Sequence, residues 1–379
     1  MPLTIGFVFD DTLDALDGVQ QHIVTIGEEL RRRGHDVHYL VGETHDSPVP
    51  NTHPLSRNVM VRFNGNRMRI PLPARRAAIH GVLAAHDFDI LHVQAPYSPF
   101  LAGRVLREAS PATGVVATYH IACANLAAQV GGRLLGLIDM QTHRRVDEVI
   151  AVSQVAARYA AATAHVRGVV IPNPVDVDRF ADAARHARRD PQAPHVVFLG
   201  RLVERKGPMQ LLDAIAYGER ASILPAGLHV TIAGDGPLMC ECRAKASRLR
   251  TPVEFLGTVD ETKAALLASS DVAAFPSLPG ETFGIVLPEA IASGAGVTLA
   301  GDNPGYRWTM RGDEDALFPI SGPDRARILA ERIRRAIADP GWAHALHKRE
   351  RALLARYDVA AVTDRVEEVY RRAIADRRR

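Results

Sequence analysis

The hydrophobic residues of the chain repeatedly form a strand pattern followed by a helix pattern. Residues 3–9 are a nearly continuous apolar run, which predicts a buried strand. From Val19 to Leu30 the apolar residues recur at helical spacing, and Gly34 ends the predicted helix. Another strand is predicted at 37–41. Continuous apolar strands that alternate with crossover helices are typical of a buried parallel sheet.

The same alternation fills both halves of the chain and predicts two α/β domains joined by a linker. Asn64-Gly65, within 60–72, predicts a hairpin with a type I′ turn. The stretch 171–194 loses the apolar period and marks the domain boundary. After Asp324 the pattern is helical, with a break at 339–341. The other predicted strands are 89–93, 114–118 and 148–152 in the first half, and 195–199, 229–233, 253–256, 272–275 and 297–300 in the second.

Composition excludes several classes of protein. The 379 residues, 47% hydrophobic and 23% charged, are typical of a globular protein of about two domains. No apolar run reaches the roughly 18 residues of a membrane span, and the first strand begins without a signal segment, so a cytoplasmic protein is expected. A net charge of +3, without basic runs interleaved with aromatics, predicts no nucleic-acid partner. Cys123, Cys240 and Cys242 do not form a disulfide or zinc framework.

The loops that follow the predicted strands carry the candidate chemistry, because parallel sheets bind ligands at their carboxyl ends. The loop from Asp10 to Gly18 ends at a predicted helix N-terminus, which favours an anion. It has no G-x-G-x-x-G pattern, and the chain has no P-loop motif. Gly18 is equally explained by a tight turn before the helix.

Two further loops lie in the second half. Arg201 and Lys206 follow its first strand and could offset the charges of a diphosphate, although a solvated loop with two cations explains them as well. In the segment from Gly280 to Glu289, a turn at a helix start offers free amides to a phosphate, and Glu281 and Glu289 lie about two helical turns apart. Alternatively, Glu281 complements the helix dipole and Glu289 is a solvated helix residue.

These motifs together resemble the retaining glycosyltransferases of family 4, which have the GT-B fold. The resemblance rests on Glu281, Glu289, Arg201 and Lys206 and extends over nearly the whole chain. It is most detailed toward the actinobacterial phosphatidylinositol mannosyltransferases, which use GDP-mannose. It implies two Rossmann-like domains facing each other across a cleft, 1–175 for the acceptor and 176–355 for the nucleotide sugar. A C-terminal helix within 356–379 is expected to pack back toward the first domain.

The resemblance also implies a role for each matching residue. Arg201 and Lys206 would bind the diphosphate, Glu281 the transferred sugar, and Glu289 the ribose. His120 would contact the sugar near the reacting carbon, although a lone histidine after a strand is more often structural. The remaining implied donor contacts are Gly18 at the diphosphate, Val259 and Lys263 at the base, the backbone amides of Phe283, Gly284, Ile285 and Val286 at the phosphate, and Thr282 without a more specific role.

The departures from the family pattern concern mostly the acceptor. Asp17 stands where relatives have the first glycine of a pair, and Pro174 where they have the glycine after Pro-Asn. Asp11 and Asn125 occupy the approximate positions of an aromatic residue and a lysine that hold a phosphoinositol headgroup in the relatives, so a different acceptor is expected. Arg67 and Arg69, beside Asn64 in the predicted hairpin, are candidate contacts for an anionic acceptor, or simply solvated.

The function expected from these residues is a metal-independent, retaining transfer of a hexose from GDP-mannose or a UDP-sugar to a hydroxyl of a small-molecule, glycoside or lipid-linked acceptor. No cofactor is expected beyond the sugar nucleotide, and peripheral membrane contact is compatible with the resemblance. The one Asp-x-Asp near a candidate loop, Asp176 to Asp178, lies in the linker rather than at a strand end. A sugar-nucleotide epimerase of the same architecture and a non-catalytic sugar-nucleotide-binding protein are the alternatives.

Overall fold

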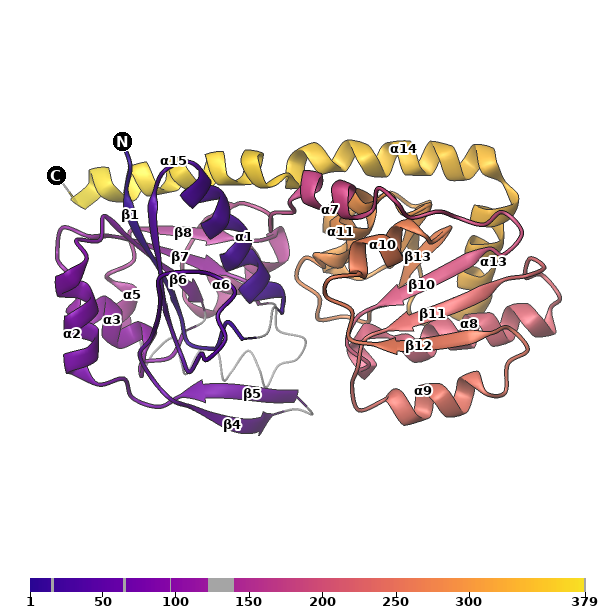
Figure 1. Ribbon diagram of the computed structural model, residues 1–379, viewed down its shortest axis with the longest axis horizontal. Coiled ribbons are helices and arrows are strands. Elements are labelled where there is room, and N and C mark those ends of the chain that lie inside the picture. Colours follow the sequence, from indigo (N-terminus) through magenta and orange to yellow (C-terminus); the bar gives the residue numbers. More distant parts are fainter. Residues whose placement is uncertain (15–16, 64–65, 96, 122–139, 378–379) are drawn as a thin grey trace. The chain divides into compact units, whose positions relative to one another are not determined.

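The computed structural model describes residues 1–14, 17–63, 66–95, 97–121 and 140–377, which form two compact units. The first unit comprises Met1–Pro174 and Val359–Arg379, and the second comprises Val175–Asp358. Each unit contains a parallel sheet with helices packed on it, which confirms the predicted α/β class (Figure 1). The sequence predicts the changes of domain after residues 175 and 355, and the units change after residues 174 and 358.

The described part of the first unit contains a seven-stranded parallel sheet in the order β3-β2-β1-β6-β7-β8-β9. The order reverses between β1 and β6. Strands β2 and β3 are added on one side of β1, and the chain then crosses over so that β6 and the later strands lie on the other side of β1. The short edge strands β3 and β9 were not predicted. The strands are β1 (Thr4–Phe9), β2 (Asp36–Val41), β3 (Thr52–Pro54), β6 (Ile90–Ala95), β7 (Gly114–Tyr119), β8 (Glu148–Ala151) and β9 (Val169–Val170).

Helices cover both faces of this sheet. Alternate residues of β1 enter opposite cores: Ile5 and Phe7 pack with α1 and α15, and Val8 packs with α2, α3 and α6. Burial on both faces explains why these strands read as continuous apolar runs. The helices of the unit are α1 (Gly18–Arg32), α2 (Arg76–Ala85), α3 (Ala102–Glu108), α5 (Met140–His143), α6 (Gln154–Thr163) and α15 (Val359–Arg377).

An antiparallel hairpin forms at the predicted place. Strands β4 (Asn58–Phe63) and β5 (Asn66–Pro71) pair in a register that puts Arg67 opposite Arg62 and Arg69 opposite Met60. The connecting Asn64 and Gly65 lie outside the described residues.

The second unit, in its described residues, holds a six-stranded parallel sheet in the order β12-β11-β10-β13-β14-β15. The strand order reverses between the central strands β10 and β13. Its strands are β10 (His195–Leu199), β11 (His229–Ala233), β12 (Val253–Gly257), β13 (Val272–Phe275), β14 (Val297–Gly301) and β15 (Leu317–Phe318). Its helices are α7 (Val177–Ala183), η1 (Glu204–Lys206), α8 (Pro208–Arg220), α9 (Met239–Ala246), α10 (Lys263–Ala268), α11 (Val286–Ser293), α12 (Pro304–Thr309), α13 (Arg325–Ala338) and α14 (Pro340–Tyr357).

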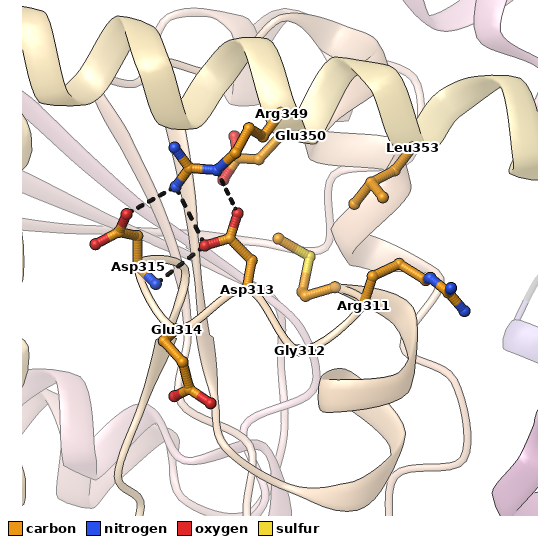
Figure 2. A pocket seen from close by; sticks show the side chains of 9 residues that line it. Arg311, Gly312, Asp313, Glu314, Asp315, Arg349, Glu350 and Leu353 are labelled. Carbon is orange, nitrogen blue, oxygen red and sulfur yellow. Dashed lines mark hydrogen bonds and ion pairs between the residues drawn. The ribbon is translucent and has the colours of Figure 1, made fainter.

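Helix α14 is fixed to the rest of the second unit by charged contacts. Arg349 Nε lies 2.7 Å from Asp313 Oδ2, and its Nη2 lies 2.8 Å from Asp315 Oδ2 (Figure 2). The next residue, Glu350, is buried, and its Oε1 accepts a hydrogen bond of 2.9 Å from the amide of Thr298 in β14. The helix therefore has a solvent-accessible ion-pair cluster beside a buried carboxyl group.

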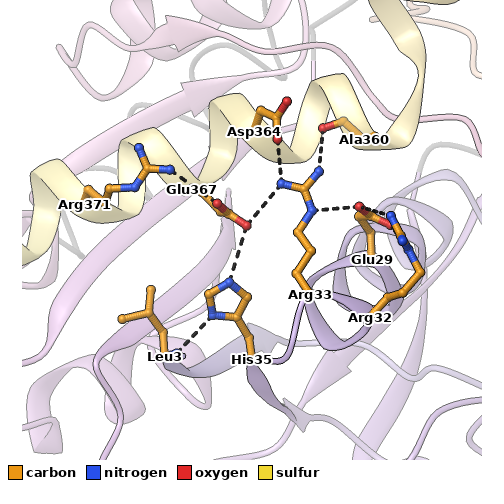
Figure 3. Close-up of polar contacts among 9 residues, drawn as sticks. All are labelled: Leu3, Glu29, Arg32, Arg33, His35, Ala360, Asp364, Glu367 and Arg371. Atoms are coloured by element: carbon orange, nitrogen blue, oxygen red, sulfur yellow. Dashed lines mark hydrogen bonds and ion pairs between the residues drawn. The ribbon is translucent and has the colours of Figure 1, made fainter. Parts of the chain in front are cut away.

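The C-terminal helix α15 packs on the first unit. Arg33, which follows α1, donates hydrogen bonds of 2.6 Å to Asp364 and 3.2 Å to Glu367 of α15 (Figure 3). Its Nε also lies 2.7 Å from Glu29 of α1, and His35 Nε2 lies 3.4 Å from Glu367. These polar contacts fix the position of α15 along α1.

The helical C-terminal region is interrupted twice. The predicted break lies at Asp339, which caps α14 by accepting a hydrogen bond from the amide of Trp342. A further break at Asp358 was not predicted; there the amide of Val175 donates a 2.7 Å hydrogen bond to the carbonyl of Tyr357.

None of the described helices has the length and apolar composition needed to cross a membrane.

Candidate active site

The main candidate site lies at the carboxyl edge of the sheet in the second unit. Arg201 and η1 follow β10, and the loop 276–285 follows the neighbouring strand β13. This is the point where the strand order reverses, and open α/β sheets bind ligands at such a point. The topology therefore brings the two sequence motifs of the second half to one place.

Glu281 is the centre of this cluster. Its side chain is only 8% exposed, and its Oε1 lies 2.9 Å from Lys206 Nζ and also accepts a hydrogen bond from Arg205. Burial alone would raise the pKa of the Glu281 carboxyl, but Lys206, Arg205 and Arg201 together lower it below its usual value. Glu281 is therefore a buried carboxylate held charged by cations, and the interpretation that it only complements a helix dipole is insufficient.

A glycine sets the position of Lys206. Gly207 has φ +72°, and a Cβ atom there would lie 2.1 Å from the carbonyl oxygen of Pro276. In addition, the amide of Leu278 donates a 2.7 Å hydrogen bond to the carbonyl of Arg205. The loop after β10 thus packs backbone to backbone against the loop after β13, which leaves no room for a side chain at residue 207.

Helix α11 begins beside Glu281. The amides of Gly284, Ile285 and Val286 donate no hydrogen bond to any residue within the described ranges, so they are available to an anion. Gly284 adopts φ +81°, and a Cβ atom there would lie 2.1 Å from the ring of Tyr306. Thr282 precedes this turn, and Phe283 is buried, with its ring against Trp308 and Tyr357. Phe283 can therefore offer a ligand only its backbone.

Glu289 forms a second buried ion pair in the first turn of α11. Its side chain is 4% exposed, and its Oε1 lies 2.8 Å from Nζ of Lys263, the first residue of α10. The Lys263 ammonium also lies 5.2 Å from the ring centroid of Phe180. The interpretation of Glu289 as a solvated helix residue is therefore wrong. Val259, which follows β12, is half-buried at the same edge of the sheet.

Arg201 differs from these paired groups. It is exposed, and its guanidinium forms no hydrogen bond with another residue in the part of the chain that the structure describes. Its influence on Glu281 is purely electrostatic. Sequence reasoning passed over two members of the cluster, Arg205 and Phe180. Arg205 adjoins Lys206 in the motif and could have been noticed there, whereas Phe180 has no local signal.

His120 follows β7 in the first unit. Its Nε2 lies 2.7 Å from Gln94 Oε1, and because an amide oxygen only accepts, Nε2 carries the proton. The ring stands edge-on to His22 of α1, with centroids 4.7 Å apart. Burial, followed by the neighbouring His22 and His92, holds the pKa of His120 well below its usual value. His120 is thus a neutral imidazole in a fixed orientation, and its contact with a sugar stays a prediction.

Gly18 opens α1 with an exposed N-terminus. A Cβ atom at Gly18 would meet no described atom within 4 Å, and its φ is not left-handed, so neither packing nor a turn among the described residues requires glycine there. Asp17, the residue before it, makes no side-chain cap to the helix. No described residue fills the space above Gly18, so a ligand has room there as far as the described part of the chain is concerned.

The structure brings together two of the predicted acceptor residues. Arg69 Nη1 lies 3.9 Å from Asp11 Oδ1, and the amide of Thr12 donates a 2.7 Å hydrogen bond to the same carboxylate. Burial raises the pKa of the Asp11 carboxyl despite these two contacts. Asn64 and Asn125 lie outside the described residues, and only the backbone of Arg67 is described.

Two family profiles together match most of the chain. The profile of Glycosyltransferase Family 4 matches residues 16–179, and that of Glycosyl transferases group 1 matches residues 193–339. The chain is 33% identical to a phosphatidyl-myo-inositol mannosyltransferase of Mycobacterium tuberculosis, over 97% of this chain and 96% of that protein. It is 30% identical to a GDP-mannose-dependent alpha-mannosyltransferase of Mycolicibacterium smegmatis, over 80% and 81% of the two chains.

Solved structures show the same fold. Sucrose-phosphate synthase of Thermosynechococcus elongatus superposes with a TM-score of 0.73 at 22% sequence identity, over 98% of this chain and 100% of that one. The predicted GT-B fold and the predicted resemblance are both confirmed. The chain belongs to glycosyltransferase family 4 and is a glycosyltransferase with the GT-B fold.

Proposed function

We propose that the protein transfers a hexose, with retention of configuration and without a metal ion, from a nucleoside diphosphate sugar to an acceptor hydroxyl. The observation that carries this proposal is the pair of buried carboxylates, Glu281 and Glu289, each bound to a lysine beside the open N-terminus of α11. The two carboxylates lie about two helical turns apart, and the free amides of α11 lie between them. One carboxylate can therefore bind the sugar, the amides the phosphate, and the other carboxylate the ribose of a single sugar nucleotide.

The charge at this edge supports departure of a diphosphate. Arg201, Arg205 and Lys206 bring three cations to the loop after β10, and Glu281 offsets one of them. The remaining positive charge and the amides of α11 can stabilise the negative charge that develops on the leaving group, the task that a metal ion performs in other transferases. This arrangement supports the predicted roles of Arg201 and Lys206.

The transfer proceeds by same-face attack. The bond between the anomeric carbon and the phosphate oxygen breaks, and the acceptor oxygen forms its bond on the same face of an oxocarbenium-like sugar. The departing phosphate oxygen accepts the proton of the acceptor hydroxyl. The chain's own groups stabilise the diphosphate (Arg201, Lys206 and the amides of α11) and hold the sugar hydroxyls (Glu281).

The donor we propose first is GDP-mannose. The names of the mycobacterial relatives specify a mannosyltransferase, and one of them specifies dependence on GDP-mannose. Lys263 Nζ is held by Glu289, which leaves Val259 as the predicted contact for the base. A UDP-sugar is the alternative donor.

The acceptor we propose is a neutral or cationic hydroxyl compound rather than a phospholipid, the substrate that the name of the Mycobacterium tuberculosis relative specifies. Asp11 places a carboxylate at the position where the negatively charged headgroup of a phospholipid would need a positive or neutral contact. Arg69, the hairpin cation that could have compensated, lies 3.9 Å from Asp11, so the two charges largely offset one another. The loop after β1 therefore offers little net attraction to a lipid phosphate.

The test of this function is a two-stage measurement on the purified full chain. Thermal melting with GDP, UDP, ADP and TDP identifies the base, since a ligand at about 100 times its dissociation constant adds roughly 2.7 kcal/mol to stability. The matching sugar nucleotide is then offered with soluble glycosides and aminocyclitols, or with phosphatidylinositol vesicles, each with EDTA. We expect transfer to soluble acceptors in EDTA. Transfer that requires added Mg²⁺ or Mn²⁺, or that occurs only with the vesicles, would contradict the corresponding part of the proposal.

The two glutamates are expected to separate by role. Glu289→Gln should weaken binding of the bare nucleoside diphosphate by about 10- to 150-fold, because a charged hydrogen bond to the ribose is worth about 1.5–3 kcal/mol. Glu281→Gln should lower turnover but leave diphosphate affinity equal or higher, because it releases Lys206 and Arg205 from their ion pairs. Calorimetric titration measures both affinities.

The matched control is Glu219→Gln, at the C-terminal end of α8, whose carboxylate accepts a hydrogen bond from the amide of Thr251 just before β12. It lies at the amino edge of the sheet and should change neither affinity nor turnover. An equal loss of diphosphate affinity in Glu281→Gln and Glu289→Gln would refute the division of roles.

A further inference from the structure

Three histidines from separate elements of the first unit converge at one place. His38 lies within β2, His53 within the edge strand β3, and His86 directly after α2. One ring nitrogen of each lies within 4.8 Å of those of the other two. No residue proposed above for sugar transfer belongs to this cluster, so the proposed sugar transfer does not explain why three histidines lie together.

The distances within the cluster are those of interacting rings. His38 Nδ1 lies 3.0 Å from His53 Nε2, and the ring centroids of His38 and His86 are 4.0 Å apart. The rings of His53 and His86 have centroids 5.5 Å apart. Three imidazoles at these distances surround a common point from three sides.

A carboxylate lies beside the central imidazole. Asp36 Oδ2 lies 3.0 Å from His38 Nε2, but Nε2 makes no hydrogen bond with a described residue, so the contact is electrostatic. The other ring nitrogen of His38, Nδ1, faces His53 Nε2 at 3.0 Å. The negative charge of Asp36 beside the ring favours a cation bound at Nδ1.

The space fits a small cation after a minor adjustment. Zinc binds imidazole nitrogens at about 2.0–2.1 Å, and in tetrahedral geometry two such nitrogens lie roughly 3.4 Å apart. His38 and His53 need to separate by a few tenths of an ångström from their present 3.0 Å, and the nitrogen of His86, which lies within 4.8 Å of the other two, needs to move to a similar spacing. His38 is buried and has the ring of Phe88 edge-on at 5.6 Å, whereas His53 and His86 are half-buried. The two less buried ligands thus lie on the solvent side, where an ion enters.

We propose that His38, His53 and His86 form a binding site for a divalent transition-metal ion, with Zn²⁺ as the ion that suits three imidazoles and one open position. Neutral imidazoles favour zinc, copper, nickel and cobalt over magnesium and calcium, which prefer oxygen ligands. Bound there, the ion joins β2, the three-residue strand β3 and the C-terminal end of α2. The site therefore stabilises the edge of the sheet and is separate from the sugar-transfer residues.

The experiment measures Zn²⁺ binding to the full chain without a histidine tag, using competition with a chromophoric chelator. We expect one high-affinity Zn²⁺ per chain. His53→Gln and His86→Gln should each weaken it by more than about 100-fold, whereas Asp36→Asn, which removes only a neighbouring negative charge, should weaken it less. His80→Gln is the matched control, because His80 lies on α2 and pairs with Glu108 outside the cluster. It should bind like the wild type.

Cobalt gives a second measurement that needs no variant. Co²⁺ bound to three imidazoles and one water absorbs visible light far more strongly than six-coordinate Co²⁺, and Zn²⁺ should abolish the band stoichiometrically. The proposal is overturned if the wild type binds no Zn²⁺ and shows only the weak six-coordinate spectrum. It is also overturned if a His53 or His86 variant with the circular dichroism of the wild type binds Zn²⁺ equally well, because the ion then lies elsewhere.

Discussion

Lys206→Ala is expected to lower turnover by about 100- to 1000-fold at saturating donor. Lys206 Nζ, one of the three cations at the edge of the second sheet, is held 2.9 Å from Glu281. Loss of one preorganised group aimed at the leaving-group charge typically removes about 2.7–4 kcal/mol of transition-state stabilisation. The measurement is kcat with GDP-mannose, or with the donor that melting identifies.

The matched control is Lys245→Ala, which removes another half-buried lysine of the second unit. Lys245 forms an ion pair with Asp213, between α9 and α8, away from the loops after β10 and β13. It should retain turnover close to that of the wild type.

Lys206→Arg shows whether turnover needs only a positive charge at this position or the compact ammonium group itself, because a guanidinium keeps the charge but has a different shape. Near wild-type turnover of Lys206→Ala would remove Lys206 from the mechanism.

The fold was largely predictable because most strands of its two parallel sheets are buried on both faces. Such strands read as apolar runs with turn residues at their ends, and the central strands from β1 to β14 appear in the sequence within a residue or two of their bounds. The missed strands β3, β9 and β15 have three, two and two residues. Segments so short have no period, and only pairing with a neighbouring strand defines them.

The break at Asp358 was missed for a similar reason. Helical spacing of apolar residues continues through 340–377, so the local pattern indicates no end. At this break the carbonyl of Tyr357 accepts a hydrogen bond from the amide of Val175, which lies 182 residues earlier in the chain. A contact of that sequence separation leaves no local trace in either segment.

For the candidate site, the sequence identified the positions but not the state of the side chains. Glu281 and Lys206 are 75 residues apart, and Lys263 and Glu289 are 26 residues apart, so neither ion pair follows from helical or strand spacing. Burial of both carboxylates depends on how two loops pack at Gly207 and Gly284, where a Cβ atom would meet Pro276 or Tyr306. The histidine cluster likewise exists only once β2, β3 and α2 are folded together.

A buried carboxyl group in the second unit predicts how stability depends on pH. Glu350 is 1% exposed in α14, and its Oε2 has no hydrogen-bonding partner among the described residues (Figure 2). Burial raises the pKa of Glu350 to about 8; the amide of Thr298 opposes this shift and Asp313 adds to it. In the unfolded chain the same group titrates near its ordinary 4.5. Between these two values the folded state holds a proton that the unfolded state has released.

The sign of the effect follows from this difference. The contribution of protonated Glu350 is fully present below pH 4.5 and is lost as pH rises through about 8. The free energy of unfolding of the wild type, relative to Glu350→Gln, should therefore fall by about 1.4 kcal/mol per pH unit across this window, a total on the order of 5 kcal/mol. The glutamine keeps an acceptor for the amide of Thr298 and never ionises.

Tryptophan fluorescence during urea unfolding at pH 5, 6, 7 and 8 measures this difference in the second unit. Both tryptophans of the chain, Trp308 and Trp342, lie within 175–358, so the signal reports that unit. Glu331→Gln, on the solvent side of α13 where the carboxylate pairs with Arg327, should run parallel to the wild type at every pH. If Glu350→Gln also runs parallel, the Glu350 carboxyl titrates alike in the folded and unfolded chain, and a bound water or local opening must then hydrate its Oε2.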